Sequence, residues 1–476
     1  MVKARIPVEQ PTNAAVLGEA LKFKTSGKVA RNRFMKSAMS ELISSYSTDL
    51  KASGIPTQRV INLYEKFGNG GFGLVLTGNI SVEHNHIEAP GAMAISKEGD
   101  SRESRLQFRR LAEAGKSGGA LFIGQLNHGG RQTFANINPN PFAVSDIPLL
   151  GIEMKGSAFG KPVALRTEQI KTEVIDRFVF AANRLHEAGF DGVELHAGLG
   201  FLLSGFLSPD TNNRTDKYGG TVEDRVRILD EIYRAIRSEI PERTGFIIGI
   251  KLNSAEFQKG GLEQNEIIKI AQIIDKIGYD FIELTGGTYE APKFFHEKES
   301  TRKREAFFIE FSGAIRSNIK NAVVYLCGGF RTVPGMVSAV KNGDTDGVSI
   351  ARPAAAEPDL PRKILNHGVQ SAVLTQFEND FMTGLPAAQT QLAQAGSSDL
   401  REANGDVCYG ISDFSDDAEA NKFKEGLMAW YGDAVAIGKQ GRMVKGVFEF
   451  KTRHKDVYGG LKNILKSPET NGNVVN

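Results

Sequence analysis

The sequence predicts an α/β protein, a (β/α)8 TIM barrel followed by a C-terminal extension. Eight apolar runs of strand length recur between residues 33 and 351. Between them lie segments such as 168–188 and 222–240, whose apolar residues recur at intervals of three and four, as in amphipathic helices. Strands that alternate with helices form parallel sheets, and eight such units fit a closed barrel. An open, doubly wound sheet shows the same alternation and stays a rival on pattern alone.

The predicted strands follow one another with helical segments between them. In order they are 33–39, 73–77, 120–126, 190–196, 246–252, 279–284, 323–326 and 347–351. Before the second strand, residues 68–73 have the G-x-G-x-x-G spacing of a dinucleotide-binding turn. In a Rossmann unit that motif follows a strand and opens a helix, whereas here it follows a helical stretch, 60–67, and opens a strand. The glycines therefore predict a helix end and a turn, not a nucleotide-binding domain.

The alternation stops after the eighth strand, which divides the chain into a barrel, 1–369, and an extension, 370–476. Residues 370–410 are rich in Gln, Ala, Ser, Asn and Gly and predict loop and irregular helix. A helical pattern returns over 416–436 and contains the only tryptophan, Trp430. We expect the extension to pack on the barrel. Its basic residues form either a solvated face or a docking surface for an anionic partner: Lys439, Arg442, Lys445, Lys451, Arg453, Lys455, Lys462 and Lys466.

Composition excludes several classes of function. The net charge of +2 gives no electrostatic case for a nucleic acid or an anionic membrane as partner. Two cysteines are too few for a disulfide framework, a four-cysteine zinc site or a cysteine-ligated iron–sulfur cluster. We find no apolar stretch of membrane-spanning length and no signal peptide, so we expect a protein of the reducing cytoplasm. The oligomeric state cannot be predicted from the sequence.

The ends of the predicted strands carry the chemistry, because all eight carboxyl ends of a parallel barrel meet on one face. They hold amide groups, one imidazole, cations and glycine turns, but no clustered carboxylates and no nucleophile elbow. We therefore predict no metal, and a site for a flat, phosphorylated ligand with polar edges. The candidate residues are Ala38, Met39, Ser40, Gly78, Gln125, His196, Lys251, Gly328, Gly329, Ala351 and Arg352.

Several of these strand ends resemble the motifs of the old yellow enzyme family, FMN-dependent NADH:flavin oxidoreductases and NADH oxidases. Any one motif is weak, but several in the correct order are specific. The similar segments are 32–40, 125–132, 188–196, 214–220, 327–331 and 350–353. The resemblance implies a barrel, FMN as cofactor, and NADH or NADPH as co-substrate.

The resemblance also implies a role for each candidate residue. Backbone amides at Gly328, Gly329 and Arg352, with the Arg352 guanidinium, would bind the FMN phosphate. The Gln125 amide would pair with the polar edge of the flavin, unless it only anchors a loop. Lys251, often arginine in the family, would stabilise negative charge on the reduced ring, unless it is a solvated strand-end lysine. The segment 38–40 and the glycine at 78 would lie against the flavin.

His196 is the candidate group for binding the electron acceptor, and its neighbourhood departs from the family. Family members usually have His or Asn three residues later and a proton-donating Tyr two residues beyond that. This chain has Leu199 and Phe201 there. A lone imidazole polarises an alkene less than a pair, and a phenylalanine has no proton to give.

The sequence therefore predicts an FMN-dependent oxidoreductase that takes hydride from NAD(P)H, with His196 and Lys251 as catalytic residues. Quinones and dioxygen suit the site as small-molecule acceptors, and activated alkenes stay possible if water or Tyr289 supplies the proton. Two alternatives are left open. One is a catalytically weak flavin-binding barrel that serves as a binding protein, and the other is a non-flavin phosphate-binding barrel enzyme such as an aldolase.

Overall fold

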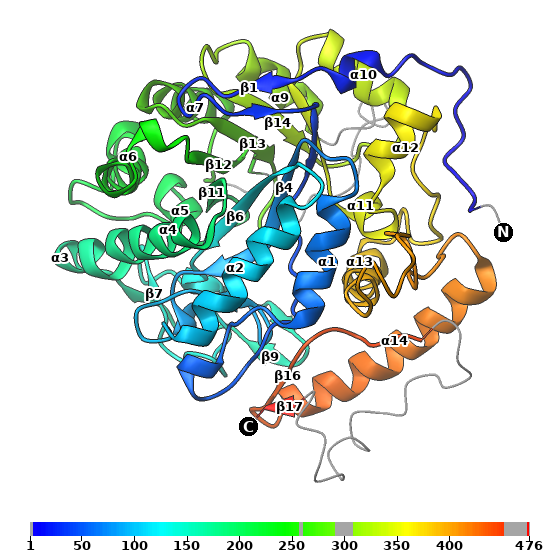
Figure 1. Cartoon of the computed structure of the whole chain (residues 1–476). Coiled ribbons are helices and arrows are strands. Elements are labelled where there is room, and N and C mark those ends of the chain that lie inside the picture. Colours follow the sequence, from blue (N-terminus) through cyan, green and yellow to red (C-terminus); the bar gives the residue numbers. More distant parts are fainter. Residues whose placement is uncertain (1–2, 257–259, 291–307, 452–473, 476) are drawn as a thin grey trace.

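Eight parallel strands close into a barrel in the computed structural model, which describes residues 3–256, 260–290, 308–451 and 474–475 (Figure 1). Neighbouring strands follow the order β3-β15-β14-β13-β12-β11-β6-β4, and pairing of β3 with β4 closes the ring. All eight predicted strands, and the barrel itself, are confirmed. The strands are β3 (Phe34–Lys36), β4 (Leu74–Ser81), β6 (Leu121–Asn127), β11 (Gly192–Ala197), β12 (Ile247–Asn253), β13 (Phe281–Thr285), β14 (Val323–Cys327) and β15 (Gly347–Ile350).

Amphipathic helices surround the strands and bury one face against them (Figure 1). They are α1 (Gln58–Gly68), α2 (Arg102–Lys116), α4 (Asp176–Ala188), α6 (Val222–Glu239), α7 (Gln264–Ile277), α9 (Ile309–Arg316), α10 (Val333–Lys341) and α12 (Leu360–His367). Their ends follow ordinary capping chemistry. The Thr221 hydroxyl accepts a hydrogen bond from the Asp224 amide at the start of α6, and Gly278 ends α7 with a φ of 112°.

The predicted helix over 168–188 is interrupted. It consists of α3 (Thr167–Ile170), a π-helical turn (Lys171–Ile175) and α4. The wider turn keeps Val174 and Ile175 buried together with Phe178 of the next turn.

The glycine motif at residues 68–73 lies at the end of α1, and β4 follows it, as the sequence predicts. Gly71 has a φ of 95°, in the left-handed region that glycine favours. A Cβ at Gly70 would lie 1.9 Å from the Pro358 carbonyl oxygen, so the chain needs a glycine for this close approach. These glycines are packing residues.

Short elements complete the barrel. A hairpin of β1 (Leu21–Lys22) and β2 (Val29–Ala30) closes its amino-terminal end, where Leu21 and Phe23 pack on apolar side chains inside the barrel. The helices α5 (Leu202–Leu207) and α11 (Arg352–Ala356) follow β11 and β15. The remaining strands are β5 (Met93–Ala94), β7 (Phe142–Ala143), β8 (Glu153–Met154), β9 (Ser157–Ala158), β10 (Val163–Ala164), β16 (Met443–Val444) and β17 (Val474–Val475).

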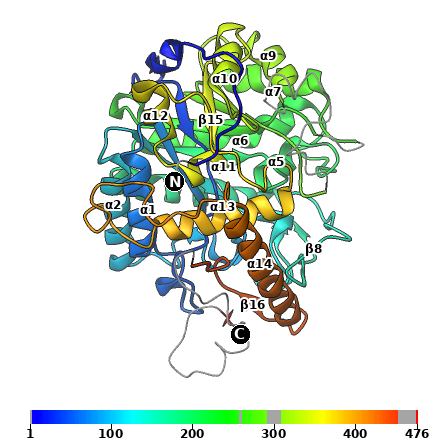
Figure 2. The same ribbon diagram turned by 90° about the vertical axis from the view of Figure 1, so that its right-hand side faces the viewer.

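The extension contains more regular structure than its composition predicts. Residues 370–410 include a 15-residue helix, α13 (Phe381–Ala395), where we expected loop and irregular helix. The predicted second helix is α14 (Asp417–Gly438). Figure 2 shows α13 lying across the barrel near α1 and α11, with α14 reaching away from it. Arg453, Lys455, Lys462 and Lys466 of the basic tail lie outside the described residues.

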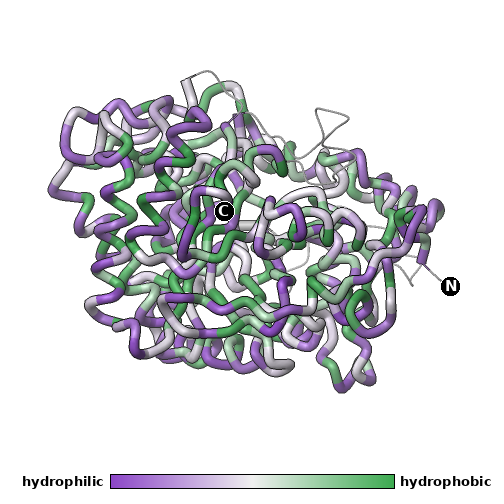
Figure 3. Tube along the Cα trace, turned by 90° about the horizontal axis from the view of Figure 1, so that it is seen from above, coloured by the Kyte–Doolittle hydropathy of each residue, from purple (hydrophilic) through white to green (hydrophobic). Residues whose placement is uncertain are grey.

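The extension has a core of its own, formed mainly by aromatic side chains such as Phe414, Phe423 and Trp430. It is joined to the barrel by polar contacts of α1: Arg59 pairs with Glu449 at 2.7 Å, and the Lys66 ammonium donates to the Ala395 carbonyl at 2.6 Å. Hydrophilic stretches follow many of the outer loops (Figure 3). Among the described residues, no helix has the length and apolar character needed to cross a membrane.

Candidate active site

A layer of buried charged side chains crosses the barrel just below its carboxyl-terminal mouth. Glu194, Lys251 and Glu283 point inward from the neighbouring strands β11, β12 and β13. The Lys251 ammonium lies 2.6 Å from Glu283 Oε2, and both side chains are at most 5 % exposed. The Ser37 hydroxyl donates to the other oxygen of Glu283 at 2.7 Å. The predicted lysine therefore lies at a strand end, but it is paired and buried rather than solvated.

The protonation states in this layer follow from burial and from the neighbouring charges. Burial alone would lower the pKa of Lys251, but Glu283 raises it, so the amine stays protonated. Burial opposes ionisation of Glu283 as well, yet Lys251 holds its pKa below the usual value. Burial and the charge of Glu283 raise the pKa of Glu194 well above the usual range, so Glu194 is neutral. The layer therefore contains one ion pair, Lys251 with Glu283, and one protonated carboxyl group, that of Glu194.

Gln125 lies in register with Glu194, and its side-chain Nε2 donates to Glu194 Oε2 at 2.5 Å. This hydrogen bond fixes which way the amide points, with the NH2 group toward β11. The carbonyl oxygen is then the part of Gln125 that is left for an N–H group of a ligand.

His196 lies on the same face of β11 as Glu194, in register with Lys251. Burial, together with the Lys251 charge, lowers the pKa of the imidazole far below its usual value, so the ring is neutral. The Gly198 backbone N–H donates to Nδ1 at 3.3 Å, which places the ring proton on Nε2. His196 can therefore donate one hydrogen bond from Nε2 to an acceptor molecule.

Leu199 adopts a left-handed backbone conformation with a φ of 57°. For a residue with a Cβ this conformation costs about 1–2 kcal/mol. Side chains on both sides hold it: the Leu199 N–H donates to Asn253 Oδ1 at 3.0 Å, and Gln132 Nε2 donates to the Leu199 carbonyl at 3.1 Å. The loop after β11 is thus fixed, with an apolar side chain where the family has a second hydrogen-bond donor.

Phe201 packs on the imidazole. The two rings meet edge to face with centroids 4.8 Å apart, and Phe201 is 2 % exposed. The next ring outward is that of Tyr289, whose centroid lies 5.9 Å from that of Phe201. Burial raises the pKa of the Tyr289 phenol, so it stays protonated. Tyr289 is therefore the nearest phenol along this line of rings.

The segment after β3 lines another part of the mouth, where Ala38, Met39 and Ser40 are half-buried. Gly78 supports this segment from β4. Its amide donates to Glu41 Oε1 at 2.8 Å, and a Cβ at this position would lie 2.2 Å from Glu41 Oε2. Gly78 thus acts in the structure as a packing residue beneath the predicted flavin-binding segment.

The predicted phosphate end lies where β14 and β15 finish. Gly328 and Gly329 have φ values of 113° and 96°, and Ala351 and Arg352 lie where β15 leads into α11. The Arg352 guanidinium makes no hydrogen bond or ion pair to another residue in the described part of the chain. Burial, then the neighbouring Arg331, lowers the pKa of Arg352 to about 10. A half-buried cation without an ionic partner fits an anionic ligand group.

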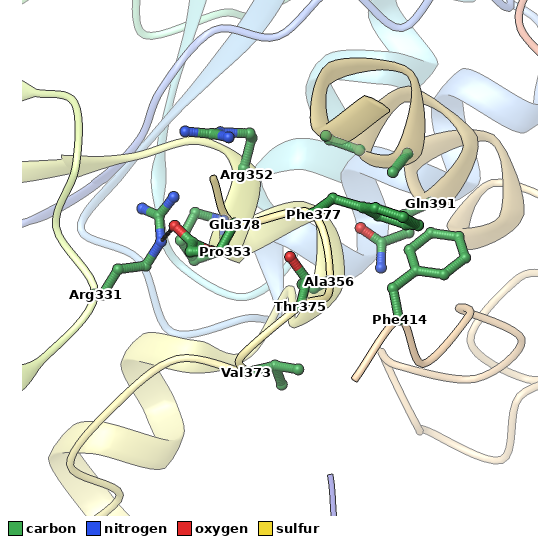
Figure 4. Close-up of a pocket in the computed structure, with 13 residues that line it drawn as sticks. Arg331, Arg352, Pro353, Ala356, Val373, Thr375, Phe377, Glu378, Gln391 and Phe414 are labelled. Carbon is green, nitrogen blue, oxygen red and sulfur yellow. Dashed lines mark hydrogen bonds and ion pairs between the residues drawn. The ribbon is translucent and has the colours of Figure 1, made fainter. Parts of the chain in front are cut away.

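Two sets of site residues were missed from the sequence. Glu194 and Glu283 gave a signal, because each is a carboxylate inside an otherwise apolar strand. Glu378 and α13 line a pocket beside Arg331 and Arg352, with the two guanidinium groups on one side of it (Figure 4). These residues gave no signal, because they lie in a segment whose composition predicts loop.

The closed (β/α)8 barrel brings His196, Gln125 and Arg352 to the carboxyl ends of its strands, as the resemblance to flavin-dependent oxidoreductases predicts. The chain belongs to the NADH:flavin oxidoreductase / NADH oxidase family, whose model matches residues 19–370. This membership confirms the predicted class of enzyme, an NAD(P)H-dependent flavin oxidoreductase, over a non-flavin barrel.

Individual relatives agree with this assignment. The NADH-dependent flavin oxidoreductase nadA of Aspergillus parasiticus is 38 % identical over 82 % of this chain and 87 % of its own length. An NADH oxidase of Thermoanaerobacter brockii is 31 % identical over 70 % of this chain and 48 % of its own length. The fold is shared with an old yellow enzyme homologue from Zymomonas mobilis, with a TM-score of 0.61, 24 % identity, and coverage of 76 % of this chain and 96 % of that one.

The residues present fit FMN, the cofactor of this family. Arg352 makes no ion pair in the described part of the chain, so its guanidinium is available to the phosphate, and Gly328 and Gly329 offer backbone amides that carry no side chain. The oriented Gln125 amide and the Lys251–Glu283 pair lie inside the barrel below its mouth, where the ring would be held. When bound, FMN supplies the hydride transfer between nicotinamide and the acceptor.

Proposed function

We propose that this flavin oxidoreductase reduces acceptors that need no proton on carbon, namely quinones or dioxygen. The observation that carries the proposal is the replacement of the family's second donor and its proton donor by Leu199 and Phe201. The Phe201 ring packs against His196 at 4.8 Å, so it excludes water from the place where a phenol would deliver a proton. The name NADH oxidase of the Thermoanaerobacter relative supports dioxygen as one such acceptor.

The chain's own residues contribute binding and orientation to this reaction. His196 donates a hydrogen bond from Nε2 to an oxygen atom of the acceptor, which draws negative charge toward that oxygen. Gln125 accepts a hydrogen bond from the cofactor ring, and its partner Glu194 fixes the orientation of the amide. The Arg352 guanidinium binds the phosphate. A quinone oxygen, unlike a carbon atom, takes its proton readily from water.

Activated alkenes are a second candidate class, which Tyr289 favours. Its phenol is protonated and lies next to Phe201 in the line of rings from His196. In this case Tyr289 would supply the proton that Phe201 cannot give. We propose either NADH or NADPH as the co-substrate. The cytoplasmic location remains a prediction from the sequence.

Steady-state rates with NADH test the choice of acceptor. We expect faster turnover with a benzoquinone than with cyclohexenone in the wild-type protein. Fast cyclohexenone turnover that is lost in His196→Ala but kept in Tyr289→Phe would contradict the proposal, because the usual alkene route would then work without Tyr289. Cyclohexenone turnover lost in Tyr289→Phe would identify the phenol as the proton donor.

A further inference from the structure

Helix α13 of the C-terminal extension contacts two segments that are predicted to bind FMN. Gly384, in its first turn, lies beside the Arg352 guanidinium. Gln389 Nε2 donates a hydrogen bond to the Ser40 carbonyl at 3.4 Å, in the segment that follows β3, the strand paired with β15. One helix from outside the family's matched region, 19–370, therefore reaches both the phosphate end and the ring end of the site.

Gly384 is a glycine because of space. A Cβ there would lie 3.3 Å from Arg352 Nη1 and 3.0 Å from the Phe377 carbonyl oxygen, so a methyl group would shift the guanidinium or the backbone by a few tenths of an ångström, and a larger side chain would shift them further. Gly384 is not among the residues with a positive φ, so its backbone conformation suits any residue. Gly432 on α14, by contrast, lies in open space, because a Cβ there would have no atom within 4 Å.

Of the two arginines that line the pocket beside Gly384, one forms an ion pair and the other does not. Glu378 of the extension pairs with Arg331 Nε at 2.6 Å. Arg352 on the same side of the pocket has no such partner in the described part of the chain (Figure 4). A phosphate monoester is the ligand group that suits a guanidinium with free N–H donors.

Other side chains of α13 anchor the helix in the extension. Gln394 Nε2 donates to the Ser412 hydroxyl at 2.7 Å, and its Oε1 accepts from the Ser412 amide at 2.9 Å. The Thr390 hydroxyl donates to the Phe448 carbonyl at 2.7 Å. These buried hydrogen bonds fix α13 against the extension's core, so the helix forms a rigid wall on the barrel side.

We propose that α13 is a wall of the cofactor site, and that Gly384 leaves the space in which Arg352 is held toward the FMN phosphate. The C-terminal extension is then part of the cofactor site rather than an appendage. The proposal rests on the assignment of the phosphate to Gly328, Gly329 and Arg352.

Flavin affinity separates the phosphate end of the site from the ring end, because riboflavin carries the ring and lacks the phosphate. The flavin-free full-length protein is titrated with FMN and with riboflavin, following the quenching of flavin fluorescence. Gly384→Val and Gly384→Ala are compared with the matched pair Gly432→Val and Gly432→Ala. Both positions are helical, so the change in helix propensity is shared.

We expect Gly384→Val to weaken FMN binding about tenfold or more, the loss of roughly one charge-assisted hydrogen bond. Riboflavin affinity should stay within about twofold of wild type, as for a substitution that touches nothing in its site. Gly384→Ala should act in the same direction with a smaller effect, and the Gly432 variants should match wild type. Because alanine is the better helix former, Gly384→Ala decides the matter if the valine variant fails to fold.

Equal weakening of FMN and riboflavin, or no change in either, would overturn the proposal. The proposal would also be overturned if the ratio of FMN affinity to riboflavin affinity did not change while the KM for NADH rose. Arg352 would then bind a phosphate group of the dinucleotide. Failure of the wild-type protein to bind either flavin would instead contradict the assignment of FMN to the barrel.

Discussion

Lys251 and Glu283 form an ion pair inside the barrel, with Nζ and Oε2 2.6 Å apart, directly below the mouth where we propose that the flavin binds. The pair changes what the lysine can contribute. The ionised Glu283 partly neutralises the positive charge of Lys251, whereas the neighbouring Glu194 is neutral. The cation at this strand end is part of a buried network that also orients Gln125.

A double-mutant cycle measures the coupling of this pair. Lys251→Met and Glu283→Gln should each lower the free energy of unfolding by about 3–5 kcal/mol, because each leaves a buried partner without its counter-charge. The double variant should lose less than the sum of the two, as followed by urea unfolding. Additive losses would show that the two side chains are not coupled.

Restoring the two family residues should restore alkene chemistry. Leu199→Asn together with Phe201→Tyr supplies the family's second donor and puts a phenol ring in place of the Phe201 ring, whose centroid lies 4.8 Å from that of the His196 imidazole. Asparagine tolerates the left-handed conformation that Leu199 adopts at a φ of 57°, so we expect the protein to fold.

The rate of cyclohexenone reduction should rise about 100-fold or more in this double variant, the usual worth of a positioned proton donor. The rate with a benzoquinone should change little. Unchanged alkene turnover in a folded, flavin-loaded variant would show that Leu199 and Phe201 do not limit the choice of acceptor.

Glu88 makes stability depend on pH near neutrality. Burial, with a smaller contribution from Glu41, raises the pKa of its carboxyl to about 7, against hydrogen bonds from Ser40 and Asn79 that lower it. The folded state thus binds this proton more tightly than the unfolded chain. The stability that Glu88 contributes is present below its usual pKa of 4.5 and is lost as the pH rises through about 7.

Glu88→Gln should remove that loss. Between about pH 5 and about pH 8, the midpoint of urea unfolding should fall less in Glu88→Gln than in wild type. The exposed Glu113 on α2 provides the control, since Glu113→Gln should leave the fall unchanged. An identical fall in wild type and Glu88→Gln would show that Glu88 ionises normally.

Gly78 should be intolerant of a methyl group. In Gly78→Ala the new Cβ would lie 2.2 Å from Glu41 Oε2 and 2.4 Å from the Met39 carbonyl oxygen. We expect a loss of about 1–3 kcal/mol in unfolding free energy from overpacking, and weaker retention of FMN because the segment 38–40 moves. Gly432→Ala, at an open position, is the control. A Gly78→Ala variant as stable as Gly432→Ala would contradict this packing role.

The barrel could be predicted from the sequence because each strand is a local apolar run, and the helices between them have local periodicity. The ends of those strands, and so His196 and Lys251, follow from the same pattern. What Lys251 pairs with could not be predicted, because Glu283 reaches it through the register of β12 against β13. Gln125 and Glu194 likewise meet only through the register of β6 and β11.

The contacts of α13 could not be predicted from the sequence for a related reason. The many glutamines in this segment predict a loop. In the structure, however, the buried Gln394 side chain donates a hydrogen bond to Ser412, and the Gln389 side chain donates one to the Ser40 carbonyl. Such partners are distant in the chain, and no local pattern marks them. No sequence pattern marks Gly384 either, because the side chain that limits the space around it, Arg352, belongs to another element.

The absorption spectrum of the purified protein under anaerobic conditions tests the central claim most directly. We predict the bands of bound oxidised FMN, their bleaching by NADH or NADPH, and rapid return of the bands on adding a benzoquinone but slow return on adding cyclohexenone. A protein whose flavin bands are not bleached by either nicotinamide, or whose bands return faster with cyclohexenone than with the quinone, would contradict the account.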